Sequence, residues 1–128
     1  MLNGKTYDNN KHNSKNFIIK RMETIKKKMT VGIVGNGFVG ESQIFAFKPT
    51  NEIRVYDIDP LKSTHTKDET YKSDFIFVCV PTPMNIYGRQ DLSFIEKVFE
   101  ESVEGPIYII KSTVLPGTTE DLQRKYPH

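Results

Sequence analysis

Apolar residues gather in four short runs along this sequence, with polar or mixed stretches between them. The runs are rich in valine and isoleucine and are nearly continuous, which is typical of strands buried on both faces of a sheet. Glycine, proline or charged residues follow the runs and favour turns there. The four predicted strands are residues 30–35, 52–59, 74–80 and 106–114.

Helical spacing of apolar residues appears between these strands. Residues 91–103 form the clearest amphipathic segment, because their apolar side chains recur at intervals of three and four. Residues 38–48 carry a rougher apolar stripe that includes Phe45, and Pro49 ends it. Strands that alternate with helices predict an α/β fold, with a mainly parallel sheet and helices on both of its faces.

Two further segments are shorter or more polar. The polar stretch after the second strand predicts an extended piece at residues 63–65 and a helical turn from Lys67. The last segment, residues 118–126, predicts a helix. Its Thr118 and Asp121 have the spacing of a capping box, in a weak variant with Asp in place of Glu.

A glycine-rich turn joins the first predicted strand to the first predicted helix. Gly35, Gly37 and Gly40 form a G-x-G-x-x-G motif in the strand–turn–helix context of dinucleotide-binding (Rossmann-like) domains. The first glycine permits the tight turn, the second lets a pyrophosphate approach the backbone, and the third allows close helix packing. Phe38 and Val39 complete this predicted cofactor-binding loop. Phe38 either lines the mouth of the cofactor site or packs against the fold.

A carboxylate follows at the distance that such domains use for the ribose. Asp57 lies 22 residues after Gly35, at the end of the second predicted strand. There it can accept hydrogen bonds from both ribose hydroxyls of the adenosine half, and it would repel a 2′-phosphate. This predicts binding of NAD in preference to NADP. Asp59 is a rival for this role, and Lys62 can flank the adenosine. The alternative for Asp57 is a structural cap of the strand end.

Size and composition narrow the class of protein. The 128 residues predict one small domain, and the single cysteine, Cys79, excludes an internal disulfide and favours a reducing compartment. No apolar run approaches the roughly 18 residues that a membrane span needs, so we expect a cytoplasmic protein without membrane association. The three histidines are scattered and predict no metal site.

Charge divides the chain unevenly. Residues 1–28 carry eight Lys/Arg and two Asp/Glu, a net charge of +6, and their composition predicts a disordered basic arm before the domain at residues 29–128. The domain carries ten Lys/Arg and fourteen Asp/Glu, a net charge of −4. This acidic balance makes nucleic acid an unlikely partner.

Four longer segments, in this order, resemble the NAD-binding domain of the UDP-glucose/GDP-mannose dehydrogenases, over about residues 30–126. The Val-Pro-Thr-Pro and Lys-Ser-Thr-Val segments within them are more specific than the glycine motif. The resemblance implies oxidation of the 6-hydroxymethyl group of a nucleotide sugar to a carboxylate, with two NAD per turnover. The segments are VGIVGNGFVG, VYDIDPLK, DFIFVCVPTPMNIYGRQDLS and IYIIKSTVLPGTT.

The resemblance also implies roles for two threonines at strand ends. Thr82, between Pro81 and Pro83, would contact the bound NAD, and the prolines would hold its backbone still. Thr113 would lie near the nicotinamide, contact NAD and help to position a catalytic water. The alternative for both threonines is ordinary capping of the strand ends.

Departures from the family limit what this chain is expected to do alone. The family's catalytic cysteine belongs to a substrate-binding half that is not found here, so we expect a chain truncated before the substrate domain. We interpret Cys79 as a small core residue within the third strand. A nucleotide sugar, a second polypeptide or a homo-oligomer are the expected partners. The alternatives are a stand-alone NAD- or nucleotide-binding module without activity and another type of Rossmann dehydrogenase.

Overall fold

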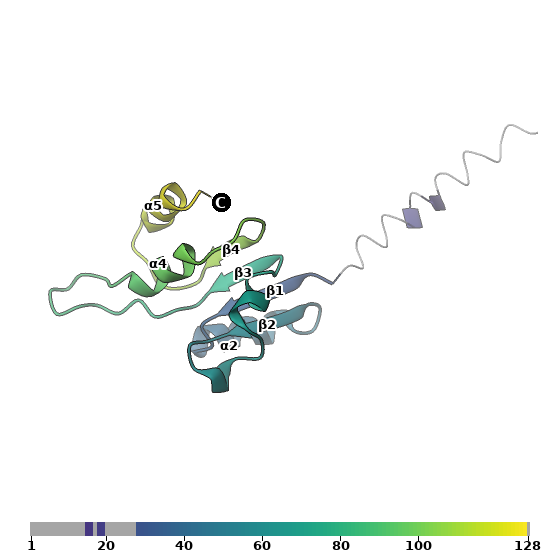
Figure 1. The fold of residues 1–128 in the computed structure, drawn as a ribbon, viewed down its shortest axis with the longest axis horizontal. Coiled ribbons are helices and arrows are strands. Elements are labelled where there is room, and N and C mark those ends of the chain that lie inside the picture. Colours follow the sequence, from purple (N-terminus) through teal and green to yellow (C-terminus); the bar gives the residue numbers. More distant parts are fainter. Residues whose placement is uncertain (1–14, 17, 20–27, 128) are drawn as a thin grey trace, which may run out of the picture.

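The structure is a computed structural model that describes residues 15, 16, 18, 19 and 28–127. The predicted basic arm therefore lies almost wholly outside the described residues. Within them, four strands form one sheet in the order β2-β1-β3-β4, and all neighbours run parallel (Figure 1). The predicted α/β fold with a parallel sheet is confirmed. The strands are β1 (Thr30–Val34), β2 (Glu52–Tyr56), β3 (Phe75–Val78) and β4 (Ile107–Ile110).

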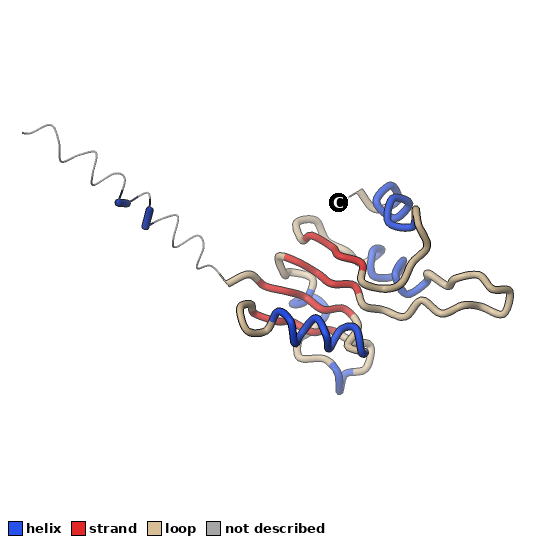
Figure 2. Tube along the Cα trace, turned by 180° about the vertical axis from the view of Figure 1, so that it is seen from behind, coloured by secondary structure: helices blue, strands red, loops and turns tan. Residues whose placement is uncertain are grey.

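Helices cover both faces of this sheet. Figure 2 shows α2 lying across one face, and contacts of Tyr71 and Val98 with the sheet place α3 and α4 on the other. The last helix, α5, packs on α4, where Tyr126 stacks on Phe99 with ring centroids 5.9 Å apart. The helices are α2 (Phe38–Phe47), the 3-10 turn η1 (Pro60–Lys62), α3 (Lys67–Thr70), α4 (Ser93–Glu100) and α5 (Thr118–Lys125).

The described residues have a separate apolar core on each face of the sheet, because neighbouring strand residues point to opposite faces. On the α2 face, Ile33 is fully buried and Phe47 meets Phe77 with ring centroids 5.0 Å apart. On the opposite face, Ile76 is fully buried and packs with Val98 of α4. Double-sided burial explains why the strands read as continuous apolar runs.

The strands end earlier than the sequence predicts. The last register pairs join Val34 to Tyr56 and to Val78, and Val78 to Ile110, so all four strands stop at one level. The residues beyond this level, which the sequence assigned to strands, leave the sheet as loops. The longest of these loops joins β3 to α4 and projects far from the sheet (Figure 1). An antiparallel bridge between Met84 and Gln90 pairs its two sides.

Two details of the predicted helices are wrong. Phe45 of α2 is 86 % exposed, so it does not belong to a buried stripe with Ile44 and Phe47. At α5 the N-cap is Gly117, with a φ of 90° and no side-chain cap, because Thr118 is already the first helical residue. The Thr118–Asp121 capping box therefore does not form.

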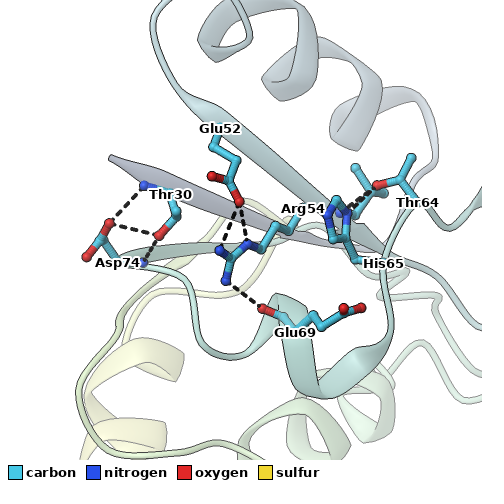
Figure 3. Close-up of polar contacts among 8 residues, drawn as sticks. Thr30, Glu52, Arg54, Thr64, His65, Glu69 and Asp74 are labelled. Atoms are coloured by element: carbon cyan, nitrogen blue, oxygen red, sulfur yellow. Dashed lines mark hydrogen bonds and ion pairs between the residues drawn. The ribbon is translucent and has the colours of Figure 1, made fainter. Parts of the chain in front are cut away.

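A capping box occurs instead at α3, the turn predicted from Lys67. Thr66 Oγ1 accepts from the backbone N–H of Glu69, and the Glu69 carboxylate accepts from the Thr66 N–H at 2.8 Å. Arg54 of β2 holds the same helix by donating from Nη1 to the Glu69 carbonyl at 3.1 Å (Figure 3). The extended piece predicted before it forms no strand. The capping box thus closes the first turn of α3, and Arg54 joins the helix to the sheet.

The separate cores make a clear stability prediction. Ile76→Ala should lower the free energy of unfolding by about 2–5 kcal/mol, because it leaves a cavity at a fully buried site. Ile86→Ala is the matched control, since that side chain is 91 % exposed in the β3–α4 loop. Urea unfolding followed by circular dichroism measures both. Equal effects of the two substitutions would contradict the assigned core.

Candidate cofactor-binding site

A pocket of about 440 Å³ opens at the carboxyl ends of the strands, within the roughly 300–1,000 Å³ range of small-molecule sites. The chain passes from β1 to β2 on one side and then to β3 on the other, and ligands of open α/β sheets bind at such a switch point. The pocket is lined by the glycine turn, the segment after β2, the end of β3 and one face of α4.

The three motif glycines have distinct steric surroundings. Gly35 has a φ of +94°, and a Cβ on it would lie 2.7 Å from the carbonyl oxygen of Cys79. A Cβ on Gly40 would lie 2.2 Å from the carbonyl oxygen of Gly35. Gly37 lines the pocket, and a Cβ there would meet no atom within 4 Å. The first and third glycines are thus required by packing, whereas the second leaves space above its backbone.

Asp57 joins the glycine turn to the end of β2. Its Oδ2 accepts from the backbone N–H of Asn36 at 2.7 Å, and its Oδ1 accepts from the N–H of Asp59 at 2.8 Å. The Asn36 side chain donates to the Lys62 carbonyl at 2.8 Å. A carboxylate has about four lone-pair sites. Asp57, which lines the pocket, therefore keeps capacity to accept from a ligand.

The rival acidic residue has another task. Asp59 does not line the pocket, and its carboxylate caps η1 by accepting from the Leu61 N–H at 3.0 Å. Lys62, in contrast, lines the pocket as expected of a residue that flanks the adenosine. The geometry therefore favours Asp57 over Asp59 as the ligand acceptor.

The loops after β3 and β4 are bonded to each other. Thr82 Oγ1 donates to the Thr113 carbonyl at 2.7 Å, and Gln90 Nε2 donates to the same oxygen at 2.7 Å. Ser112 Oγ donates to the Val80 carbonyl at 2.6 Å. The structure thus brings the two predicted threonines together at the strand ends. Gln90 was not predicted, because its side chain reaches Thr113 only through the fold of its loop.

Phe38 and Val39 lie apart from the pocket lining. Phe38 is 87 % exposed, which excludes the alternative that it packs against the fold, and Val39 is 40 % exposed. Contact of either with a cofactor stays a prediction. Four residues of α4 that the sequence assigned only to a packed helix do line the pocket, namely Phe94, Lys97, Val98 and Glu101 at its C-cap.

Cys79 is the first residue after β3 rather than a residue within it, although its N–H still donates to the Val34 carbonyl at 2.8 Å. Its side chain is half-buried, and this burial raises the pKa of the thiol to about 11. The thiol is therefore neutral near pH 7 and a poor nucleophile. The part of the chain that the structure describes contains no cluster of metal-ligating side chains. Its helices include none that is both long and apolar enough to span a membrane.

Comparison with known families settles the relationship. Residues 58–127 match the profile of the UDP-glucose/GDP-mannose dehydrogenase family, NAD binding domain. This chain belongs to that family. The match contains Lys62, Thr82 and Thr113, while the glycine turn and Asp57 precede it. NAD is accordingly the cofactor of this domain, and the open backbone at Gly37 beside the Asp57 carboxylate fits such a ligand.

The chain is also similar to individual nucleotide-sugar dehydrogenases. The chain is 34 % identical over 74 residues to the UDP-N-acetyl-D-mannosamine dehydrogenase of Pyrococcus horikoshii. The aligned segment covers 55 % of this chain and 18 % of that protein. It is 35 % identical over 74 residues to the UDP-glucose 6-dehydrogenase of Rickettsia conorii, 54 % of this chain and 17 % of that protein. The chain thus spans less than a fifth of the length of these relatives.

A solved structure supports the fold. The crystal structure of a ternary complex of GDP-mannose dehydrogenase from Pseudomonas aeruginosa superposes with a TM-score of 0.60 at 22 % identity. The superposition covers 77 % of this chain and 33 % of that one. It confirms the Rossmann-like architecture of the domain.

The glycines give a paired prediction. Gly37→Ala should leave the melting temperature nearly unchanged, because its φ of −90° and ψ of −162° suit alanine and its surroundings are open. It should still weaken NAD binding about tenfold or more, roughly 1.4 kcal/mol, because the new Cβ occupies the approach to the backbone. Gly40→Ala should instead destabilise the fold by about 1–3 kcal/mol through overpacking. Thermal melting and calorimetric titration measure the two effects, and unchanged NAD affinity of Gly37→Ala would contradict a phosphate site there.

Proposed function

We propose that this chain supplies the NAD-binding portion of a nucleotide-sugar 6-dehydrogenase, which oxidises a sugar 6-hydroxymethyl group to a carboxylate. The observation that carries the proposal is the bonded pair of loops after β3 and β4, in which Thr82 and Gln90 both donate to the Thr113 carbonyl. These loops begin at the carboxyl ends of β3 and β4 and lie within the region that matches the family. Related proteins named for three different nucleotide sugars support the substrate class.

The adenosine half of NAD is assigned to the pocket between the segment after β2 and α4. Asp57 would accept from the ribose hydroxyls, and Lys62 would flank the adenosine. The pyrophosphate is assigned to the backbone at Gly37, where the start of α2 adds free amides and the positive end of a helix dipole. Phe38 and Val39 begin α2 directly after Gly37, and we propose that they contact the bound cofactor from there.

The nicotinamide half is assigned to the loops that Thr82 and Thr113 share. Hydrogen bonds to its carbonyl hold the Thr113 backbone, so its side chain is held near a fixed place. The proposed role of Thr113 is to orient a water, and that of Thr82 is to contact the cofactor. NAD held by these loops would supply the hydride acceptor for oxidation of the substrate. Everything that the chain's own residues do here is binding and orientation.

Covalent capture of the substrate lies beyond these residues. The 128 residues contain one cysteine, and the raised pKa of Cys79, about 11, keeps its thiol neutral. A second polypeptide or a further segment would have to supply the nucleophile and hold the nucleotide sugar. The single cysteine also supports a cytoplasmic location.

Replacement of Asp57 tests the adenosine assignment. Asp57→Asn should weaken NAD binding and reduce the preference for NAD over NADP, because it removes charge-assisted hydrogen bonds and the repulsion of a 2′-phosphate. Each such hydrogen bond contributes about 1.5–3 kcal/mol. Calorimetric titration of the variant with both dinucleotides measures the change in the ratio.

Asp59→Asn is the matched control for this test. The same chemical change is made two residues away, on a side chain that caps η1 and does not line the pocket. Its NAD/NADP ratio should equal that of the wild type. A ratio that moves with Asp59 and not with Asp57 would exchange the two assignments.

The chemistry gives a second prediction. The purified 128-residue chain should bind NAD but form no NADH with UDP-glucose, GDP-mannose or UDP-N-acetylmannosamine. Neither a reactive thiol nor a held substrate is available, and catalysis depends on both nucleophile and proximity. Absorbance of the reduced nicotinamide follows the reaction.

Addition of a cell extract fraction or of a purified second polypeptide to the same assay distinguishes a divided enzyme from a stand-alone binding module. Activity that appears only with the addition, and that falls with Thr113→Ala, would support a divided enzyme. Turnover by the pure chain would overturn the proposal that the nucleophile lies elsewhere. NAD binding with no activity under any combination would favour the stand-alone binding module.

A further inference from the structure

One face of α4 forms a wall of the pocket. Phe94, Lys97, Val98 and Glu101 recur at helical spacing and all line it, opposite Asp57 and the segment that follows β2. From the first to the last of them the helix rises about 10 Å. The wall changes in character along this length, from an aromatic ring to an apolar side chain and then to a carboxylate.

The carboxylate at the end of this wall is held from outside the pocket. Glu101 Oε2 lies 3.1 Å from Nζ of Lys67 on α3, and the Glu101 side chain is 35 % exposed. The hydrogen bond to Glu101 raises the pKa of Lys67. Lys67 in turn belongs to α3, whose first turn is closed by its capping box and which Arg54 of β2 joins to the sheet. Glu101 therefore has a defined position, with its second oxygen available to a ligand.

The surroundings suit a flat heterocycle. Val80, Pro81, Phe94 and Val98 supply apolar surface, and most ligand sites combine such walls with a few placed polar groups. An ionised carboxylate only accepts hydrogen bonds. The 6-amino group of adenine donates, whereas the 6-oxo group of hypoxanthine or guanine is an acceptor that a carboxylate repels.

We propose that Glu101 selects the adenine base of NAD by accepting a hydrogen bond from its 6-amino group, against dinucleotides that carry a 6-oxopurine. The inference rests on the proposed adenosine site and adds a specificity-determining residue to it. A carboxylate that faces the 6-position accepts from a 6-amino group and repels a 6-oxo group, and this difference sets the discrimination.

Two ammonium groups in the same pocket would act in the opposite direction. Lys97 lies one turn before Glu101 on the same wall, and Lys62 lies on the wall beside Asp57. An ammonium at the 6-position would favour a 6-oxo group. The sign of the base preference therefore reports which side chain meets that position.

The test compares NAD with nicotinamide hypoxanthine dinucleotide, which differs from it only in the base. Calorimetric titration of the full chain should show about tenfold or greater preference for NAD, the equivalent of one charge-assisted hydrogen bond. Glu101→Gln should reduce this preference several-fold, because a carboxamide can rotate to donate to the 6-oxo group.

Two variants control for effects unrelated to the base. Glu100→Gln makes the same change on the neighbouring exposed residue, which does not line the pocket, and should keep the wild-type ratio. Lys67→Met removes the ion pair but keeps the carboxylate, so its ratio should stay above that of Glu101→Gln. Melting temperatures confirm that all variants remain folded.

The outcomes separate this inference from the function proposed above. Equal wild-type affinity for the two dinucleotides, a preference for the hypoxanthine form, or an unchanged ratio in Glu101→Gln would each overturn the inference. If NAD binding still responds to Asp57→Asn in those cases, the adenosine site stands. Failure of the wild-type chain to bind NAD at all would overturn both.

Discussion

The architecture depends on a close approach of backbone to backbone where β1 ends. The end of β1, the residue after β3 and the start of α2 meet at Gly35 and Gly40 without room for a Cβ at either position. Glycine is the residue that permits both the left-handed turn and this proximity. Because the three segments converge there, the N-terminus of α2 and the ends of β2 and β3 border a single pocket.

Around that contact, the loops bond mainly to one another. Asp57 links the segment after β2 to the glycine turn, and the Thr113 carbonyl gathers two donors from the β3–α4 loop. Each link joins residues far apart in sequence. A binding site made of loops is therefore held by side chains that the sheet itself does not supply, as is common in α/β proteins.

The sequence could predict features that depend on local patterns, but not those that depend on contacts between segments far apart in the chain. Strands such as Phe75–Val78 were predictable because burial on both faces demands an unbroken apolar run. The glycine turn and Asp57 were predictable from spacing, since strand ends place them side by side. The cap of α5 was not, because the left-handed Gly117 displaced Thr118 from the cap position. Glu101 was not either, since its place depends on Lys67, which lies on another helix.

Asp57 also bears on how cofactor choice can change over evolution. Its carboxylate already accepts from the Asn36 and Asp59 amides, in addition to any bonds that it offers a ribose. A neutral or basic residue at position 57 would no longer repel a 2′-phosphate. It would also weaken or remove the hydrogen bond from the Asn36 amide that joins the glycine turn to the end of β2. With Asp57 in the role proposed above, a change from NAD to NADP would require at least one further substitution to hold Asn36.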